Sequence, residues 1–210
     1  MRSKRPRPIS ALALITLSLP LLATAALAFD NPLSTSEIRE AYFLATGNPD
    51  KRAEFFDKYT HHPPAPKSGP AIASIQIQTP FAAIVQDITQ RSLNVRAPDA
   101  VKEYYGKPAQ FRVRVVIDFT ATYPASASTS MQLGSFWKKF HVHLRQGKEI
   151  PSRSVQGKPI LSTETPSGYI GATIVANYDP EKIESGPATV VVTGPDDARA
   201  ETTFDLSSLR

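Results

Sequence analysis

Cysteine is absent from the 210 residues. This absence excludes disulfide bonds, thiolate metal sites, cysteine nucleophiles and a lipid-modified N-terminal cysteine. A strong excess of charge of one sign is also missing beyond the first 28 residues. Those residues contain four of the 24 basic residues and none of the 19 acidic ones, so the remaining chain has a formal charge of +1. The overall charge of +5 therefore reflects the N-terminal segment and does not predict nucleic-acid binding.

Motifs for catalysis and for nucleotide cofactors are absent as well. The sequence contains no G-x-S-x-G, H-E-x-x-H, P-loop or G-x-G-x-x-G pattern. Carboxylates that could be mistaken for a catalytic pair occur in predicted turns, where turn chemistry explains them: Glu181, Glu184, Asp196 and Asp197. The sequence therefore favours a non-catalytic protein without a cofactor.

A long apolar run occurs once, at the N-terminus. Met1–Pro8 is basic and Ile9–Phe29 is uncharged. Ala26-Leu27-Ala28 places small residues where a signal peptidase requires them. The pattern predicts a secretory signal cleaved after Ala28. An uncleaved membrane anchor is the alternative, but Pro20 interrupts the run. No later stretch is apolar enough to span a membrane, so we expect an exported protein, periplasmic or secreted, with no span in the mature chain.

Residues 29–108 are predicted to be mainly helical with one strand. Ser34 and Glu37 have the spacing of a capping box, and Gly47 supplies a stop for the helix that follows. Asn48-Pro49 is typical of the start of a second helix. The remaining elements expected here are a strand at Ile72–Gln78 and helices at Phe81–Gln90 and Pro98–Tyr105.

From Gln110 the hydrophobic period changes to two. Apolar residues occupy the odd positions from Phe111 to Tyr123, which predicts a long half-buried strand. Phe136, Phe140, Val142 and Leu144 predict a second alternating strand. Further strands are expected near Ile160 and at Tyr169–Tyr178, Ala188–Thr193 and Arg199–Leu206. Strands at this spacing are typical of an antiparallel β-sandwich.

The last two strands flank Gly194-Pro195-Asp196-Asp197, a hairpin signal. This hairpin resembles the closing strands of immunoglobulin-like modules; the resemblance covers about the last 25 residues and implies architecture alone. The predicted fold is therefore α+β: a signal peptide (1–28), a helical N-terminal region (29–108) and an immunoglobulin-like antiparallel β-sandwich (109–210).

Basic side chains alternate on the polar sides of two predicted strands. If those strands pair as a hairpin, six basic groups gather on one face because a period of two places each set on a single side. The six are Arg112, Arg114, Lys139, His141, His143 and Arg145. Such a face would suit phosphate, sulfate or carboxylate groups of a glycan or lipid. The alternative is a solvated outer face.

The histidines offer a second class of function. His141 and His143 are two residues apart on a strand, so both rings can reach one metal ion, with a third ligand from Asp118, Glu149 or the His61-His62 pair. Lys139 and Arg145 argue against a metal here because they would repel a divalent cation. We therefore expect no bound metal, and keep a metal-binding protein or small hydrolase as the alternative.

Three aromatic residues could line a sugar groove: Tyr104, Tyr105 and Trp137. Packing of Trp137 under a loop or helix is the preferred interpretation, since Trp137 lies on the polar side of its predicted strand. Taken together, the sequence predicts an exported module of the cell envelope or exterior that binds or scaffolds another component, such as an envelope protein or an anionic glycan.

Overall fold

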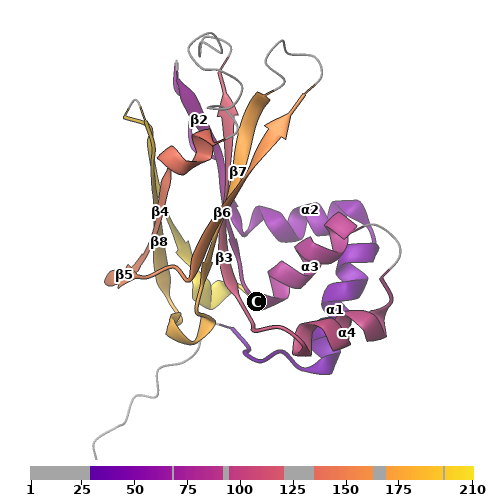
Figure 1. The fold of residues 1–210 in the computed structure, drawn as a ribbon. Helices are drawn as coiled ribbons and strands as arrows, with labels where there is room; N and C mark the ends of the chain where they lie inside the picture. Colours follow the sequence, from indigo (N-terminus) through magenta and orange to yellow (C-terminus); the bar gives the residue numbers. More distant parts are fainter. Residues whose placement is uncertain (1–28, 68, 92–94, 121–134, 163–168, 196) are drawn as a thin grey trace, which may run out of the picture.

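The structure, a computed structural model, describes residues 29–67, 69–91, 95–120, 135–162, 169–195 and 197–210. These residues form three layers (Figure 1): a group of helices, a five-stranded sheet in the middle and a four-stranded sheet on the far side. The predicted signal segment 1–28, the strand end at 121–123 and the loop after it lie outside the described residues. Within the described part of the chain, no helix is long and apolar enough to cross a membrane.

The middle sheet is antiparallel, with the order β1-β2-β3-β7-β6 in the described chain. Its strands are β1 (Thr60–His61), β2 (Pro70–Gln78), β3 (Phe111–Phe119), β7 (Tyr169–Tyr178) and β6 (Ser154–Leu161). The central strand β3 pairs with β2 on one side and β7 on the other. β2 therefore belongs to the same sheet as β3, although the sequence assigns the two strands to different regions.

The outer sheet is also antiparallel, with the order β5-β4-β8-β9 in the described residues. Its strands are β5 (Lys148–Ile150), β4 (His141–Gln146), β8 (Pro187–Thr193) and β9 (Arg199–Asp205). The predicted closing hairpin is present as β8 and β9. A mixed α+β protein with two antiparallel sheets is thus confirmed.

The two sheets enclose the larger hydrophobic core. Phe111, Val113, Val115 and Ile117 of β3 are all fully buried in it. They face apolar residues of the outer sheet: Val142, Leu144, Val190 and Val192. The period of two in β3 therefore correctly identified which side of the strand faces inward.

The helices have a core of their own. They are α1 (Thr35–Thr46), α2 (Pro49–Asp57), α3 (Pro80–Arg91) and α4 (Ala97–Tyr105). The predicted capping box starts α1: the Glu37 N–H donates to the Ser34 hydroxyl, and the Ser34 N–H donates to the Glu37 carboxylate. Apolar residues of α1, α3 and α4 form the second core, including Ile38, Ala41, Phe81, Val85 and Ala100.

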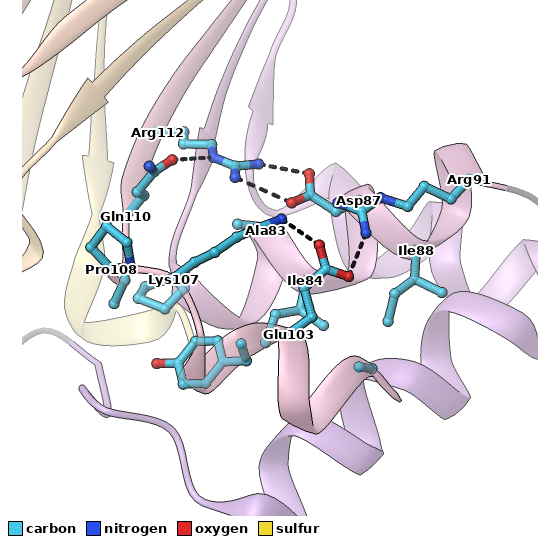
Figure 2. A pocket seen from close by; sticks show the side chains of 14 residues that line it. Ala83, Ile84, Asp87, Ile88, Arg91, Glu103, Lys107, Pro108, Gln110 and Arg112 are labelled. Carbon is cyan, nitrogen blue, oxygen red and sulfur yellow. Dashed lines mark hydrogen bonds and ion pairs between the residues drawn. The ribbon is translucent and has the colours of Figure 1, made fainter. Parts of the chain in front are cut away.

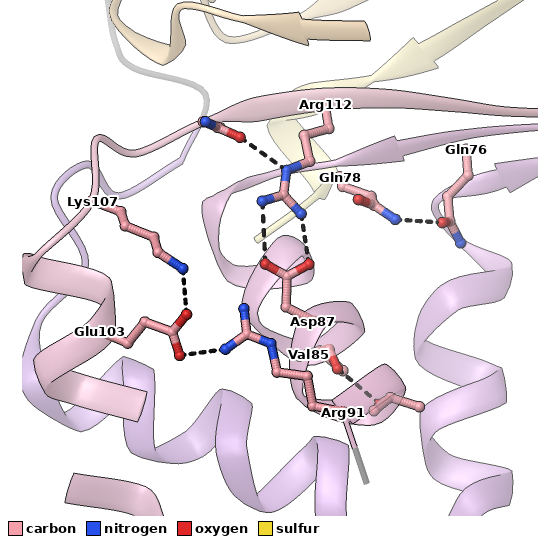
Figure 3. Close-up of polar contacts among 10 residues, drawn as sticks. Gln76, Gln78, Val85, Asp87, Arg91, Glu103, Lys107 and Arg112 are labelled. Atoms are coloured by element: carbon pink, nitrogen blue, oxygen red, sulfur yellow. Dashed lines mark hydrogen bonds and ion pairs between the residues drawn. The ribbon is translucent and has the colours of Figure 1, made fainter. Parts of the chain in front are cut away.

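Polar groups are buried where the helices cover the middle sheet. Gln76 and Gln78 alternate with Ile75 and Ile77 on β2, as expected, but both faces of this strand are buried. The amide of Gln78 donates to Gln76 (Figure 3), and the amide of Gln76 donates to the hydroxyl of Thr60. These hydrogen bonds reduce the cost of removing the amides from water.

A second polar contact joins the end of the chain to the helices. The Tyr59 hydroxyl donates to the main-chain oxygen of Arg210 at 2.8 Å and accepts from the Arg210 N–H at 2.9 Å. The Arg210 guanidinium pairs with Glu40 of α1 and lies 4.7 Å from the centroid of the Phe81 ring. Arg210, which follows β9 in the chain, therefore contacts both α1 and α3.

Two predictions about the second alternating strand are wrong. Phe136–Lys139 is a short 3-10 helix, and the strand begins only at His141. β3 and β4 do not pair, because they belong to different sheets. The strand expected near Ile160 is present as β6, which is eight residues long, and the additional strand β5 precedes it.

Trp137 lies in this 3-10 helix and packs on strand β6. The contact is close: a β-carbon added at Gly157 would lie 1.9 Å from the Trp137 ring. Glycine at 157 thus gives the indole a flat surface to lie on. Packing accounts for the position of Trp137, although the ring lies on a strand and not under a loop or helix.

Candidate functional site

The predicted basic face is divided between opposite sides of the molecule. Because the inward residues of β3 and β4 point toward a shared core, their alternating polar residues point away from each other. Arg112 and Arg114 lie on the side of the middle sheet that carries the helices, whereas His141, His143 and Arg145 lie on the outer side of the other sheet. Lys139 belongs to the 3-10 helix and not to β4. The prediction that six basic groups gather on one face is therefore wrong.

Acidic partners further reduce the positive charge of the outer face. The Nδ1 of His143 lies 2.7 Å from the Oε1 of Glu149, and this contact lowers the pKa of the Glu149 carboxyl. On β9, Arg199 pairs with Glu201 at 2.7 Å. The outer sheet consequently presents a mixed, solvated surface, which is the alternative that the sequence left open.

A histidine metal site gains no support from the geometry. Among the described residues, no group of three or more histidine, aspartate or glutamate side chains is placed to hold an ion. His61 lies on β1 of the middle sheet and His62 contacts the Ala73 carbonyl, so this pair belongs to the other sheet. Asp118 is on β3, also in the middle sheet.

The two tyrosines at the end of α4 hold the chain that precedes α1. The Leu33 N–H donates to the Tyr104 hydroxyl, and the Tyr105 hydroxyl donates to the Leu33 carbonyl, both at 3.0 Å. Their rings meet edge to face, with centroids 5.4 Å apart. A structural role thus accounts for both hydroxyl groups.

A pocket of about 100 Å³ lies between α3, α4 and the start of β3 (Figure 2). Its apolar part consists of side chains that α3 and α4 turn toward each other, together with Pro108 and Ala109 on the way to β3. These side chains include Ala83, Ile84 and Ile88 of α3 and Ala100 and Tyr104 of α4. Ile84 is only half-buried, so it is accessible at the pocket, whereas Ala83, Ile88 and Ala100 are buried.

Charged residues border this apolar part and form two adjoining groups (Figure 3). Arg112 donates to both oxygens of Asp87, at 2.7 and 3.2 Å, and through its Nε to Gln110 at 3.2 Å. Glu103 accepts from Arg91 at 2.5 Å and also pairs with Lys107. Arg91 lies between the two carboxylates, so the charges alternate from Arg112 to Lys107.

The ion pair of Glu103 and Arg91 stays charged over the physiological range. Hydrogen bonds from Arg91, and then from Lys107, lower the pKa of Glu103 to about 2. The bond to Glu103 also raises the pKa of Arg91. With three cations and two carboxylates, the border carries one net positive charge. A carboxylate with so low a pKa is a poor general base, so Glu103 is suited to ion pairing and not to proton transfer.

Sequence reasoning singled out Arg112 and Tyr104 of this site, each for another reason, and missed the other residues. Arg112 was expected on a basic face, but its partner is Asp87. The spacing of Glu103 and Lys107 is the i, i+4 spacing of helical ion pairs and could have indicated their contact. Nothing in the sequence pairs Asp87 with Arg112, because the two are brought together by the packing of α3 on the sheet.

Comparison with known proteins assigns no family. No protein-family model matches the chain, and no curated protein is significantly similar to it.

Proposed function

We propose that the protein is an exported, non-catalytic binding module of the cell envelope or exterior, and that the pocket between α3, α4 and β3 is its binding site. One observation carries the proposal: accessible apolar surface at Ile84 lies inside a border of charged side chains with a net positive charge. Apolar centres with polar rims are typical of interfaces and ligand sites. The pairing of both carboxylates with cations favours binding over catalysis.

The remaining parts of the proposal concern export and architecture. Phe29, the first residue of the proposed mature chain, is buried and its ring stacks on Phe111. Cleavage after Ala28 would leave this contact in place. We propose an immunoglobulin-like type for the sandwich because its last two strands, β8 and β9, form an antiparallel hairpin at one edge of the outer sheet.

Ile84→Glu tests the binding site. The variant places a carboxylate beside Asp87 and Glu103 and removes apolar contact area. We expect it to reduce retention of the partner by about tenfold or more, since central side chains of an interface can contribute 2 kcal/mol or more. The measurement is recovery of native envelope components on immobilised protein, quantified against wild type.

Ile170→Glu is the matched control. Ile170 is an exposed isoleucine on β7, outside the pocket, so the same change should leave retention unaltered. Melting curves of both variants check that they are folded. The proposed function is wrong if wild type retains nothing, or if both variants retain the same component as well as wild type does.

Export is tested by the N-terminus of the protein recovered outside the cytoplasm. We expect it to begin at Phe29, because the small residues at Ala26 and Ala28 fit signal peptidase. Edman sequencing or intact mass provides the measurement. A membrane-bound protein that retains Met1 would contradict cleavage and would support the anchor alternative.

A further inference from the structure

The size of the pocket limits what can enter it. An apolar cavity of about 150 Å³ accommodates one benzene molecule, and this pocket has about 100 Å³. A branched aliphatic side chain of about four carbon atoms, such as that of leucine or isoleucine, fits this space on the scale of that cavity. A ring system or a long acyl chain would remain largely outside.

The charged border indicates which charge the groups that flank the inserted side chain should carry. Positive groups lie at both ends of the alternating charges, Arg112 at one end and Lys107 at the other (Figure 3). The contacts of Arg112 with Asp87 and Gln110 use three of the five N–H donors of a guanidinium. Acidic groups on either side of the inserted side chain would therefore meet positive charge.

The exposure of these cations favours a protein segment over a small free acid. The side chains of Arg112, Arg91 and Lys107 are 21, 43 and 62% exposed. Water screens Arg91 and Lys107, and Arg112 is already paired with Asp87 and Gln110. Each of these cations therefore contributes little to binding. A small carboxylate would gain only these weak contacts, whereas a protein segment adds main-chain and side-chain contacts outside the pocket.

On the basis of the proposed function, we infer that the pocket receives one leucine- or isoleucine-sized side chain of a partner protein, from a segment in which acidic residues flank that side chain. The apolar walls between α3 and α4 bind the aliphatic group. Arg112 and Lys107 attract the flanking carboxylates and so select the segment by charge as well as by shape.

Labelled nine-residue peptides with a central leucine between glutamates test the inference with the purified protein. Fluorescence anisotropy measures their affinity. A peptide with serine in place of leucine keeps the charge, and one with glutamines in place of glutamates keeps the aliphatic group. We expect the acidic leucine peptide to bind more tightly than both, and its affinity to fall with added salt.

Lys107, which follows α4, and Lys102, which lies within α4, provide a matched pair of variants. Lys107→Gln should weaken binding of the acidic leucine peptide by up to about fivefold, the range of an exposed ion pair, and should weaken its salt dependence. Lys102→Gln removes an exposed charge from α4 outside the pocket and should change neither. Ile84→Glu should abolish the preference for leucine over serine.

Equal binding of the three peptides, or equal effects of the two lysine variants, would overturn the inference. So would 4-methylpentanoate binding as tightly as the acidic leucine peptide, since it would identify a small acid as the ligand. If these results occur while envelope retention still depends on Ile84, the proposed function stands and only the partner chemistry is wrong. If Ile84 has no effect in either experiment, both proposals fail.

Discussion

Replacing Val115 by aspartate is expected to unfold the protein. Val115 is 0% exposed in the central strand of the middle sheet, between Ile75 of β2 and Ile174 of β7. A carboxylate there has no partner, and its burial costs several kcal/mol. Since domains are stable by only about 5–15 kcal/mol, the variant should show no cooperative thermal transition by circular dichroism.

Val155→Asp is the matched control for this substitution. Val155 lies on the edge strand β6 and is 42% exposed, so its carboxylate remains in water. Its melting temperature should stay close to that of wild type. Similar melting curves for the two variants would show that the inward side of β3 has been assigned incorrectly.

Phe29→Ala is expected to lower the free energy of unfolding by about 3–5 kcal/mol, the usual cost of removing a buried phenylalanine ring. Phe29 is 8% exposed, and its ring stacks on Phe111 with centroids 5.7 Å apart and planes 15° apart. The measurement is the midpoint of urea unfolding at a constant slope.

Phe43→Ala serves as the comparison. Phe43 lies on α1 and is 64% exposed, so its removal should change the free energy of unfolding by no more than about 0.5 kcal/mol. If the two variants unfold at the same urea concentration, Phe29 contributes nothing to the core. The contact between the start of the mature chain and β3 would then have to be discarded.

Local elements of this fold were predictable from the sequence because their signals act over a few residues. The Ser34–Glu37 capping box fixed the start of α1, and Asn48-Pro49 fixed the start of α2. The alternation after Gln110 identified the inward side of β3. Each signal depends on backbone hydrogen bonds or on burial of one face, and neither requires knowledge of a distant partner.

Strand partners were not predictable in the same way. Alternation shows which side of a strand is buried, but not which strand lies beside it. β3 and β4 follow each other in sequence, which suggested a hairpin, yet β3 pairs with β2 and β7, and β4 pairs with β5 and β8. Phe136 was assigned to β4 because its apolar character fits the alternation, although the chain forms a 3-10 helix there.

The candidate site was hidden from the sequence for a related reason. Its charged border joins Asp87 of α3, Glu103 of α4 and Arg112 of β3, which come from three different elements. Only the Glu103–Lys107 pair has a local spacing that could have been recognised. The pocket exists because α3 and α4 pack together beside the first residues of β3.

The strand order also determines when the protein can fold. β3 pairs with β7, and β4 pairs with β8. Neither pairing can form until the later strand of the pair has been synthesised. Closing such long loops costs entropy before the contacts stabilise anything, and folding rates fall accordingly. For the export that we propose, slow folding is an advantage: the precursor has time to cross a membrane as an extended chain before the sandwich closes.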